Sequence, residues 1–517
     1  MPINPTYPGV YIEELENPVK SIVGVSTSVT AFVGRALKGP VNEPTLIHNF
    51  GEFGSTFGGL WKESVMSYSV YQYFLNGGVD AVIVRVVHSD AQKAKFENTA
   101  ETGITFEAAN EGSWADNFRV TTDNEVNNDA EDHDNLFNVR VKENVGGNYI
   151  ERESFLNVSF EEGHKRYVVT VLREESKLVR VSTISLTARP SGEVNFDVAA
   201  TTGQDGSDLE DSDIEGDEDD KEGIYALANT DIFNLLCIPP PDPDGTTTSG
   251  HYSSVYTNAA DYCERRRAML IVDPPSNWTD KDDPVDTTKG IDGASFGLTR
   301  TANAAIYFPH IKAPDPLSEN RLKAFPPSGA VAGVIAKTDA QRGVWKAPAG
   351  IDATLAGVPD LDIRLTDEEN GTLNPQGINC LRILPPAGRV IWGARTMKGA
   401  DRLANQWKYL PVRRMALYIE ESLYRGTQWV VFEPNDEPLW SQIRLNVGAF
   451  MHDLFRKGAF QGSTPKEAYL VKCDKETTTQ TDIDKGIVNI VVGFAPLKPA
   501  EFVMIKIQQL AGQTEGQ

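Results

Sequence analysis

The stretch that decides the fold is PPSGAVAGVIAKTDAQRGVWKAP, residues 326–348. Its central part, residues 329–337, consists mostly of Gly, Ala and Val and predicts a helix of small residues. Such a helix carries little side-chain bulk, so neighbouring backbones can approach it closely. Ordinary core packing explains the pattern without any special function. Residues 302–309 before it and 389–393 after it predict strands, and strands that alternate with helices indicate an α/β domain.

The same alternation is present near the start of the chain. Residues 28–34 predict a strand, residues 65–76 an amphipathic helix and residues 81–87 a buried strand. Later, residues 268–273 predict a further buried strand directly after a helical segment. These segments together predict one α/β core that is assembled from distant parts of the chain.

Length and cysteine content limit the possible classes of protein. At 517 residues the chain is too long for one ordinary core, and it should form roughly two to four domains. The four cysteines lie far apart and form no C-x-x-C pair, so they indicate neither a disulfide framework nor a zinc ribbon. We expect them to be buried small apolar residues in a reducing compartment. The cysteines are Cys237, Cys263, Cys380 and Cys473.

Charge and hydropathy argue against two classes of partner. The net charge of −24 opposes binding to a phosphate backbone, which takes its affinity from clustered Lys and Arg. We therefore expect no nucleic-acid partner. The sequence begins without a signal-peptide pattern and contains no run of about 18 apolar residues, so we expect folding in the bacterial cytoplasm and no membrane insertion.

Between the first and later parts of the core lies a region with a different pattern. Residues 118–122, 136–141, 167–172 and 178–182 predict short strands separated by polar turns, with few helix signals. This composition predicts an inserted β-rich domain over residues 97–203.

An acidic tract follows the insertion. From Asp205 to Glu222 there are eleven acidic residues and one lysine. Asp211, Asp213 and Glu222 fall at positions 1, 3 and 12 of a loop with the spacing of a calcium-binding EF-hand. However, no amphipathic helix precedes this loop, and charge blocks of this kind usually stay solvated. We therefore predict a flexible linker and no metal site.

The C-terminal region contains the clearest helix of the chain, residues 438–457. Pro438 stands at its start and Gly458 just past its end, as is typical of helix boundaries. Its apolar residues fall on one face: Trp440, Ile443, Val447, Phe450 and Leu454. Around it, residues 411–415, 428–432 and 487–492 predict strands.

Both ends of the sequence carry short segments with strand potential, which cannot be stable as isolated strands. They need the edge of a sheet. Each could complete the sheet of its own domain, or it could pair with an edge on a neighbouring molecule by main-chain hydrogen bonds. In the second case the residues that pair are Val10, Tyr11, Ile12, Glu13, Val503, Met504, Ile505 and Ile507.

A series of motifs in a fixed order resembles the tail sheath proteins of contractile phages and phage-like injection particles. The motifs are residues 8–14 (PGVYIEE), 27–39 (TSVTAFVGRALKG), 73–78 (YFLNGG), 233–239 (FNLLCIP), 326–348, 373–379 (LNPQGIN), 392–396 (WGART), 412–414 (VRR), 431–436 (VFEPND) and 499–502 (PAEF). Each motif is weak alone, but their common order covers much of the chain. The resemblance favours strand pairing between neighbouring molecules, because sheath subunits exchange their terminal arms.

The resemblance implies a multidomain α+β or α/β fold, in which a mixed-sheet sheath core carries an inserted β-rich domain and extended N- and C-terminal arms. The expected parts are an N-terminal arm (1–24), the first core part (25–96), the insertion (97–203), the acidic linker (204–223), the second core part (224–376), a C-terminal sheath domain (377–495) and a C-terminal arm (496–517).

The resemblance further implies a structural subunit that polymerises helically and contracts to drive an inner tube through a target envelope. The expected partners are further copies of the chain, the inner tube protein, and baseplate and tail terminator proteins, within a phage virion or an injection particle. Sheath proteins contact the tube through a helix near the C-terminal domain. Residues 438–457 are the matching helix, with Arg444, Arg456 and Lys457 as candidate contacts. Arg456 and Lys457 could instead simply favour the negative end of the helix dipole.

Two other classes of function remain open at this point. A non-contractile tail or adhesion module would also be structural, but it would trimerise rather than form long tubes. An enzyme would need an active site assembled across domains. The chain contains no phosphate loop, no nucleophile elbow and no H-E-x-x-H zinc helix, so we predict no catalytic residues and no cofactor.

Overall fold

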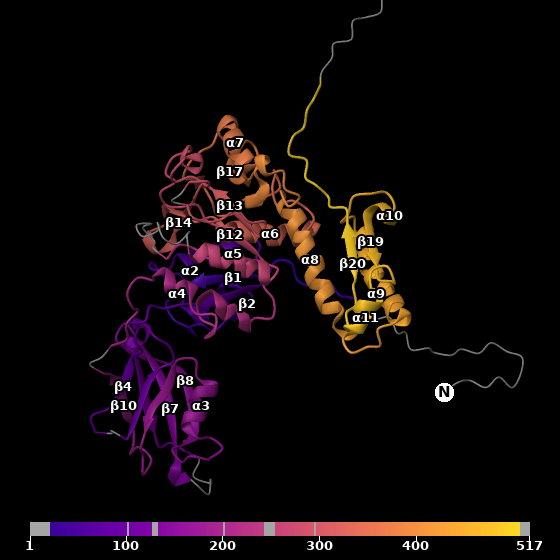
Figure 1. Cartoon of the computed structure of the whole chain (residues 1–517). Coiled ribbons are helices and arrows are strands. Elements are labelled where there is room, and N and C mark those ends of the chain that lie inside the picture. The colour runs from indigo at the N-terminus through magenta and orange to yellow at the C-terminus, as the bar shows by residue number, and fades with distance from the viewer. Residues whose placement is uncertain are drawn as a thin grey trace, which may run out of the picture. The chain divides into compact units, whose positions relative to one another are not determined.

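The computed structural model of the chain describes residues 21–100, 103–126, 133–199, 202–241, 254–293 and 296–506. These residues form two compact units (Figure 1). The larger unit comprises Ser26–Gln341 and Pro348–Lys408, and the smaller unit comprises residues 21–25, Arg342–Ala347 and the chain from Tyr409 onward. The chain therefore passes from one unit to the other at four points.

The larger unit is built on a mixed sheet of eight strands in the order β18-β17-β13-β12-β11-β1-β3-β2. Its central strands are parallel, and only β2 and β18 run antiparallel to their neighbours. The strands are β1 (Thr30–Gly34), β2 (Thr45–Ile47), β3 (Ala81–Arg85), β11 (Leu235–Cys237), β12 (Met269–Val272), β13 (Ala304–Phe308), β17 (Ile378–Leu384) and β18 (Gly388–Ile391). Every residue of β1, β3, β12 and β13 is buried, as expected for parallel strands with both faces covered.

Helices of the larger unit cover this sheet. They are α1 (Phe50–Phe57), α2 (Val65–Leu75), α4 (Asp211–Glu215), α5 (Val255–Arg265), α6 (Ser328–Arg342) and α7 (Asp367–Leu373). The predicted helix of small residues is confirmed as part of α6, and it packs closely on α2. A β-carbon at Gly329 would collide with the carbonyl group of Ser69, and one at Gly333 with the carbonyl oxygen of Tyr73. Glycine is therefore required at both positions.

The predicted β-rich region forms an antiparallel sheet of seven strands in the order β8-β7-β6-β10-β4-β5-β9. The strands are β4 (Lys95–Glu97), β5 (Ile104–Ala108), β6 (Phe118–Asp123), β7 (Leu136–Val145), β8 (Asn148–Ser159), β9 (Val179–Ile184) and β10 (Val194–Val198). The prediction of a strand over 167–172 is wrong, because residues Val168–Glu175 form helix α3. Val168, Val171 and Leu172 are buried on one side of that helix, so their spacing suits a helix better than a strand.

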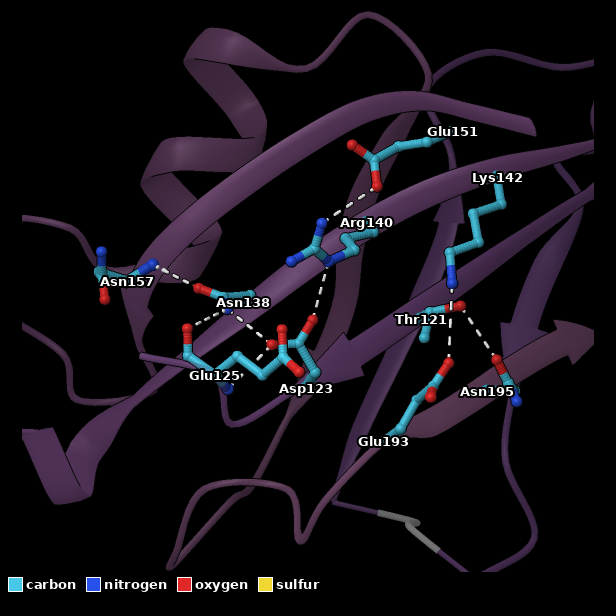
Figure 2. Close-up of polar contacts among 10 residues, drawn as sticks. All are labelled: Thr121, Asp123, Glu125, Asn138, Arg140, Lys142, Glu151, Asn157, Glu193 and Asn195. Atoms are coloured by element: carbon cyan, nitrogen blue, oxygen red, sulfur yellow. Dashed lines mark hydrogen bonds and ion pairs between the residues drawn. The ribbon is translucent and has the colours of Figure 1, made fainter. Parts of the chain in front are cut away.

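Side chains alternate along β7 between an apolar and a polar face. Phe137, Val139 and Val141 belong to the buried core of this sheet. On the opposite face, Arg140 bridges Asp123 at 2.8 Å and Glu151 at 3.2 Å (Figure 2). This alternation fixes the register of the strands, because a slip of one residue would place Arg140 in the apolar core.

The prediction of a flexible acidic linker is wrong. Residues Asp211–Glu215 form helix α4, in which Glu210 and Asp213 make a reciprocal capping box. Ile214 is fully buried in the core of the larger unit, and Ser254 at the start of α5 donates a hydrogen bond to Asp211 at 3.0 Å. The tract is folded because two buried apolar side chains, Leu209 and Ile214, and several capping interactions hold it. The loop that calcium would need does not form, since Asp211 and Asp213 lie in this helix.

Smaller elements complete the larger unit. A three-stranded sheet contains β14 (Ile311–Asp315), β15 (Arg321–Phe325) and β16 (Asp360–Leu361). The 3-10 helices of the described chain are Ser113–Asn117, His133–Asn135, Gly223–Asn229, Asp283–Val285, Pro316–Ser318, Asn374–Gln376, Met397–Gly399, Asp401–Leu403 and Gln428–Val430.

The smaller unit contains four helices and one hairpin in its described residues. They are α8 (Leu410–Gly426), α9 (Glu437–Arg456), α10 (Pro465–Ala468), α11 (Gln480–Asp484), β19 (Tyr469–Lys472) and β20 (Val491–Phe494). The helix predicted over 438–457 is confirmed as α9, and all five residues of its predicted apolar face are buried. Gly458 follows it with a φ of 76°, which suits a glycine just past a helix end.

Three predictions for this region are wrong. Residues 411–415 are not a strand but the first turns of α8, where Pro411 is tolerated because it needs no hydrogen-bond partner. Residues 428–430 form a 3-10 turn after α8. The expected domain start at 377 comes too early, because β17 pairs with β13 in the eight-stranded sheet and the smaller unit begins at Tyr409.

Candidate assembly interface

The hairpin of β19 and β20 is the candidate site for assembly, because it is a sheet of only two strands. Tyr469 pairs with Phe494 and Lys472 with Val491. One face of the hairpin packs on α9 and its apolar core (Figure 1). Among the described residues neither outer edge has a further strand. A two-stranded sheet with two open edges is at best marginally stable and offers its main-chain groups to another strand.

The outer face of the hairpin is also open. Leu470 and Val491 lie on it, with 48% and 46% of their surfaces exposed. Gly493, which pairs with Leu470, has no other neighbour close to where its β-carbon would be. The hairpin therefore has room on one face as well as at its edges.

The predicted arm residues near the C-terminus lie in an exposed segment. Phe502, Val503, Met504 and Ile505 are between 72% and 85% exposed. Residues 501–506 belong to the end segment with strand potential but form no strand, so this part does not complete the sheet of its own domain. Val10, Tyr11, Ile12, Glu13 and Ile507 lie outside the described residues.

The beginning of this segment is held near the start of α8. The hydroxyl of Tyr409 donates a hydrogen bond to Glu501 at 3.2 Å. Tyr409 is the residue that precedes α8. The exposed apolar residues therefore begin directly after an anchored position.

The three candidate tube contacts on α9 differ in their surroundings. Arg444 is only 31% exposed; it donates to the carbonyl oxygen of Cys473 and, at 2.6 Å, to Glu437. The bond to Cys473, the residue after β19, joins α9 to the hairpin, whereas Glu437 is the first residue of α9 itself. Lys457 forms an exposed ion pair with Asp453 at 2.7 Å, and this hydrogen bond raises the pKa of Lys457. Arg456 is exposed near the end of the helix.

The loop before α9 contains a feature that sequence reasoning missed. Val431 is exposed, and the side chain of Phe432 is fully exposed at 103%. Phe432 also has a φ of 71°, a backbone region that bulky residues seldom adopt. The VFEPND motif marked this loop, but the expectation of a strand over 428–432 gave no hint that its aromatic residue projects into solvent.

The buried titratable side chains outside this interface have structural roles. Burial raises the pKa of Asp273 to about 7, and its carboxylate accepts a hydrogen bond from the Ser328 backbone at 2.7 Å, at the start of α6. All four cysteines are buried, as predicted. Within the described ranges there is no group of three or more side chains suited to hold a metal ion. None of the helices in that part of the chain is both long and apolar enough to cross a bilayer.

Comparison with known proteins decides the family. Residues 216–397 match the phage tail sheath protein central domain, and residues 404–509 match the phage tail sheath C-terminal domain. The two matches together cover more than half of the chain. The chain belongs to the phage tail sheath family. The second match begins close to Tyr409, where the smaller unit of this sheath protein starts.

Curated relatives agree with this assignment. The tail sheath protein of Burkholderia phage BcepMu is 23% identical over 474 residues, which cover 88% of this chain and 87% of the relative. A prophage major tail sheath protein of Pseudomonas aeruginosa is 25% identical over 243 residues, which cover 46% of this chain. The match spans only 57% of the length of that relative and 26% of the tail sheath protein of Vibrio phage KVP40.

Solved structures show the same fold. The sheath of the anti-feeding prophage in its contracted state has a TM-score of 0.58 at 24% identity, over 98% of this chain and 99% of that one. The contracted PVC sheath complex, from an extracellular contractile injection system, gives 0.57 at 23% identity, over 98% of each chain. A sheath tail protein of Listeria innocua gives 0.59 at 12% identity, over 92% and 96%. Relatives and structural neighbours are thus structural sheath proteins, and the predicted α+β multidomain fold is confirmed.

Proposed function

We propose that this sheath protein polymerises into a helical sheath around an inner tube and that contraction of the sheath drives the tube through a target envelope. One observation supports the proposal: a two-stranded hairpin with open edges and an exposed apolar segment occur in the same unit, and neither finds a partner strand among the residues that the structure describes. The apolar segment of one copy can pair with the open edge of the hairpin in a neighbouring copy.

The physical basis is strand addition. Main-chain hydrogen bonds contribute about 0.5–1.5 kcal/mol each, and a strand added to β19 or β20 would also bury apolar side chains. Residues 502–505 and 10–13 are the segments that we expect to add. Since the donor segment and the acceptor edge are different surfaces, the contact is heterologous, and heterologous contacts propagate into rings or helices.

Contraction would then be a change between two arrangements of the same linked subunits. The extended array is metastable, a signal from the baseplate releases it, and subunit contacts that favour the shorter, wider array drive the change. Covalently continuous arms keep neighbouring subunits joined while they move. Besides further copies, the partners are the tube protein and the baseplate and tail terminator proteins.

The exposed end of α9 is the proposed tube contact. Arg456 and Lys457 lie there, whereas Arg444 holds α9 to β19 and is a weaker candidate than its sequence position indicates. The alternative role of Arg456 and Lys457 is stabilisation of the helix end through the helix dipole.

Electron microscopy of the purified chain tests the proposal. We compare the full chain with one that lacks residues 1–20 and one that lacks residues 502–517. The full chain should form tubes, and both truncated chains should stay unassembled while their thermal unfolding remains that of the full chain. Equal tube formation by the truncated chains would refute the role of the arms.

A further inference from the structure

Val431 and Phe432 form an apolar projection on the smaller unit, which we call the knuckle. Phe432 is fully exposed although it is large and apolar, and its φ of 71° is unfavourable for a bulky residue. Backbone strain of this kind persists where the surrounding structure imposes it, and it is frequent at functional sites. Aromatic side chains are also enriched among the residues that dominate binding energy at interfaces.

The loop that carries the knuckle is fixed in place. The side chain of Asn435 accepts a hydrogen bond from the Trp440 indole and donates one to the carbonyl oxygen of Ile487, both at 2.9 Å. Asp436 caps the start of α9. A partner that binds the knuckle would therefore not have to order this loop, which lowers the entropic cost of binding.

The knuckle adjoins the hairpin that we propose as the acceptor of a neighbouring arm. Ile487, which Asn435 contacts, precedes β20 by four residues. Ile487 and Val491 are both exposed apolar residues, so the apolar surface continues from this loop to the start of β20. The arm of the same chain leaves from the opposite end of β20, after Phe494.

The apolar run Phe502–Ile505 lies away from the knuckle of its own chain. Glu501 is bonded to Tyr409, just before α8, whereas the knuckle follows the end of that helix. The 17 residues of α8 span about 25 Å at 1.5 Å per residue. Figure 1 shows the chain after β20 passing the start of α8 and running away from its far end. The apolar run that meets the knuckle therefore comes from another copy.

The composition of the run fits this position. Successive side chains of a strand point to opposite faces, so Phe502 and Met504 would share one face and Val503 and Ile505 the other. When the run lies along the hairpin, one pair can face the apolar core at α9. The other pair would stay exposed to solvent unless a second apolar surface packs against it.

We propose that Phe432 anchors the C-terminal arm of a neighbouring copy by packing against the apolar run Phe502–Ile505. The inference rests on the proposed exchange of arms and adds the residue that holds the incoming strand. The knuckle would then contribute to specificity, because an arm without apolar residues at these positions would gain nothing by packing against Phe432.

Cross-linking between two variants tests the contact. The four native cysteines are buried, so an added exposed cysteine is the one that reacts. Chains with Phe432→Cys and chains with Met504→Cys that carry a size tag are mixed, assembled and oxidised. We expect disulfide-linked dimers of mixed size, which can join only different copies. As a matched control, Leu445→Cys, on the exposed face of α9, should give none with Met504→Cys.

A second variant measures the contribution of the ring. Phe432→Gly removes the ring and relieves the positive φ, so the melting temperature should stay unchanged or rise. The protein concentration needed for tube formation should rise about tenfold or more. Phe432→Leu keeps most of the apolar surface and should change that concentration much less.

Two results would overturn the inference while the proposed function stands: tubes that form without any 432–504 cross-link, or tubes of Phe432→Gly at the concentration of the unmodified chain. Failure of the unmodified chain to form tubes under any condition would contradict the proposed function and this inference with it.

Discussion

The eight-stranded sheet of the larger unit and the hairpin of the smaller unit satisfy their backbone groups in opposite ways. Five strands of the large sheet are buried along their whole length, and helices cover the sheet. Within the described residues the hairpin has two strands, two open edges and one open face. The large sheet is complete within one chain, whereas the hairpin is suited to be completed by another molecule. The two sheets thus differ in how far the described part of the chain covers their edges and faces.

The largest effect should come from filling the close approach of α6 to α2. Gly333→Val would place side-chain atoms against the backbone of Tyr73, which cannot move without displacing α2. We expect the free energy of unfolding of the larger unit to fall by about 3 kcal/mol. Urea denaturation, followed by circular dichroism, measures this loss. An unchanged urea midpoint would mean that the two helices are not in close contact.

The next effect concerns the carboxyl group buried beneath α6. Burial raises the pKa of Asp273 to about 7 from 3.8, so between these values the folded chain keeps a proton that the unfolded chain has lost. Stability should therefore fall by about 2 kcal/mol from pH 5 to pH 7, in addition to any other groups. Asp273→Asn keeps an oxygen acceptor for Ser328 and should remove this part of the slope. Urea midpoints of the unmodified chain and of Asp273→Asn at pH 5, 6 and 7 test this. An equal change of stability with pH in both proteins would contradict the role of Asp273.

A smaller effect separates the arginines of α9. Arg444→Met removes the bonds to Cys473 and Glu437, so we expect a loss of about 1–2 kcal/mol in the stability of the smaller unit. Hydrogen exchange over residues 437–473 should become faster. Arg456→Met, on the exposed part of the same helix, serves as the control and should leave exchange unchanged. Equal exchange in both variants would show that Arg444 does not hold the hairpin to α9.

The smallest effect is expected at the open face of the hairpin. Gly493→Val adds the same side chain as the substitution in α6, but its β-carbon meets only Leu470, at 3.8 Å. The unfolding free energy should change by less than about 0.5 kcal/mol. A loss as large as that of Gly333→Val would mean that this face is closed in the isolated chain. The two substitutions together give a direct comparison of the complete sheet with the incomplete one.

Much of the fold was predictable where the apolar pattern has one clear period. All five residues expected on the buried face of α9 are buried, and the parallel strands follow the apolar runs. The predictions failed where short apolar runs fit both periods, as at Val168–Glu175. They also failed in the acidic tract, where two apolar residues among many charged ones, Leu209 and Ile214, hold the segment on the core.

The candidate site was only half predictable. The terminal segments stood out because strand-forming residues at a chain end require a partner. The acceptor edge could not be recognised from the sequence because β19 and β20 are short. Whether their edges are free also depends on the pairing of all other strands, which the sequence alone does not give. The roles of Phe432 and Arg444 depend on contacts between distant residues. Arg444 bonds to Cys473, just after β19 and 29 residues away, and the exposure of Phe432 follows from the loop that Asn435 fixes.

The four passages of the chain between the two units have a mechanical consequence. Residues 342–347 belong to the smaller unit although both flanking segments belong to the larger one, and residues 21–25 add a further connection. A protease that cut any single connection would leave the units covalently tied. Tension applied to the smaller unit would likewise be divided among several backbone connections, so that no one peptide segment would have to carry the whole load.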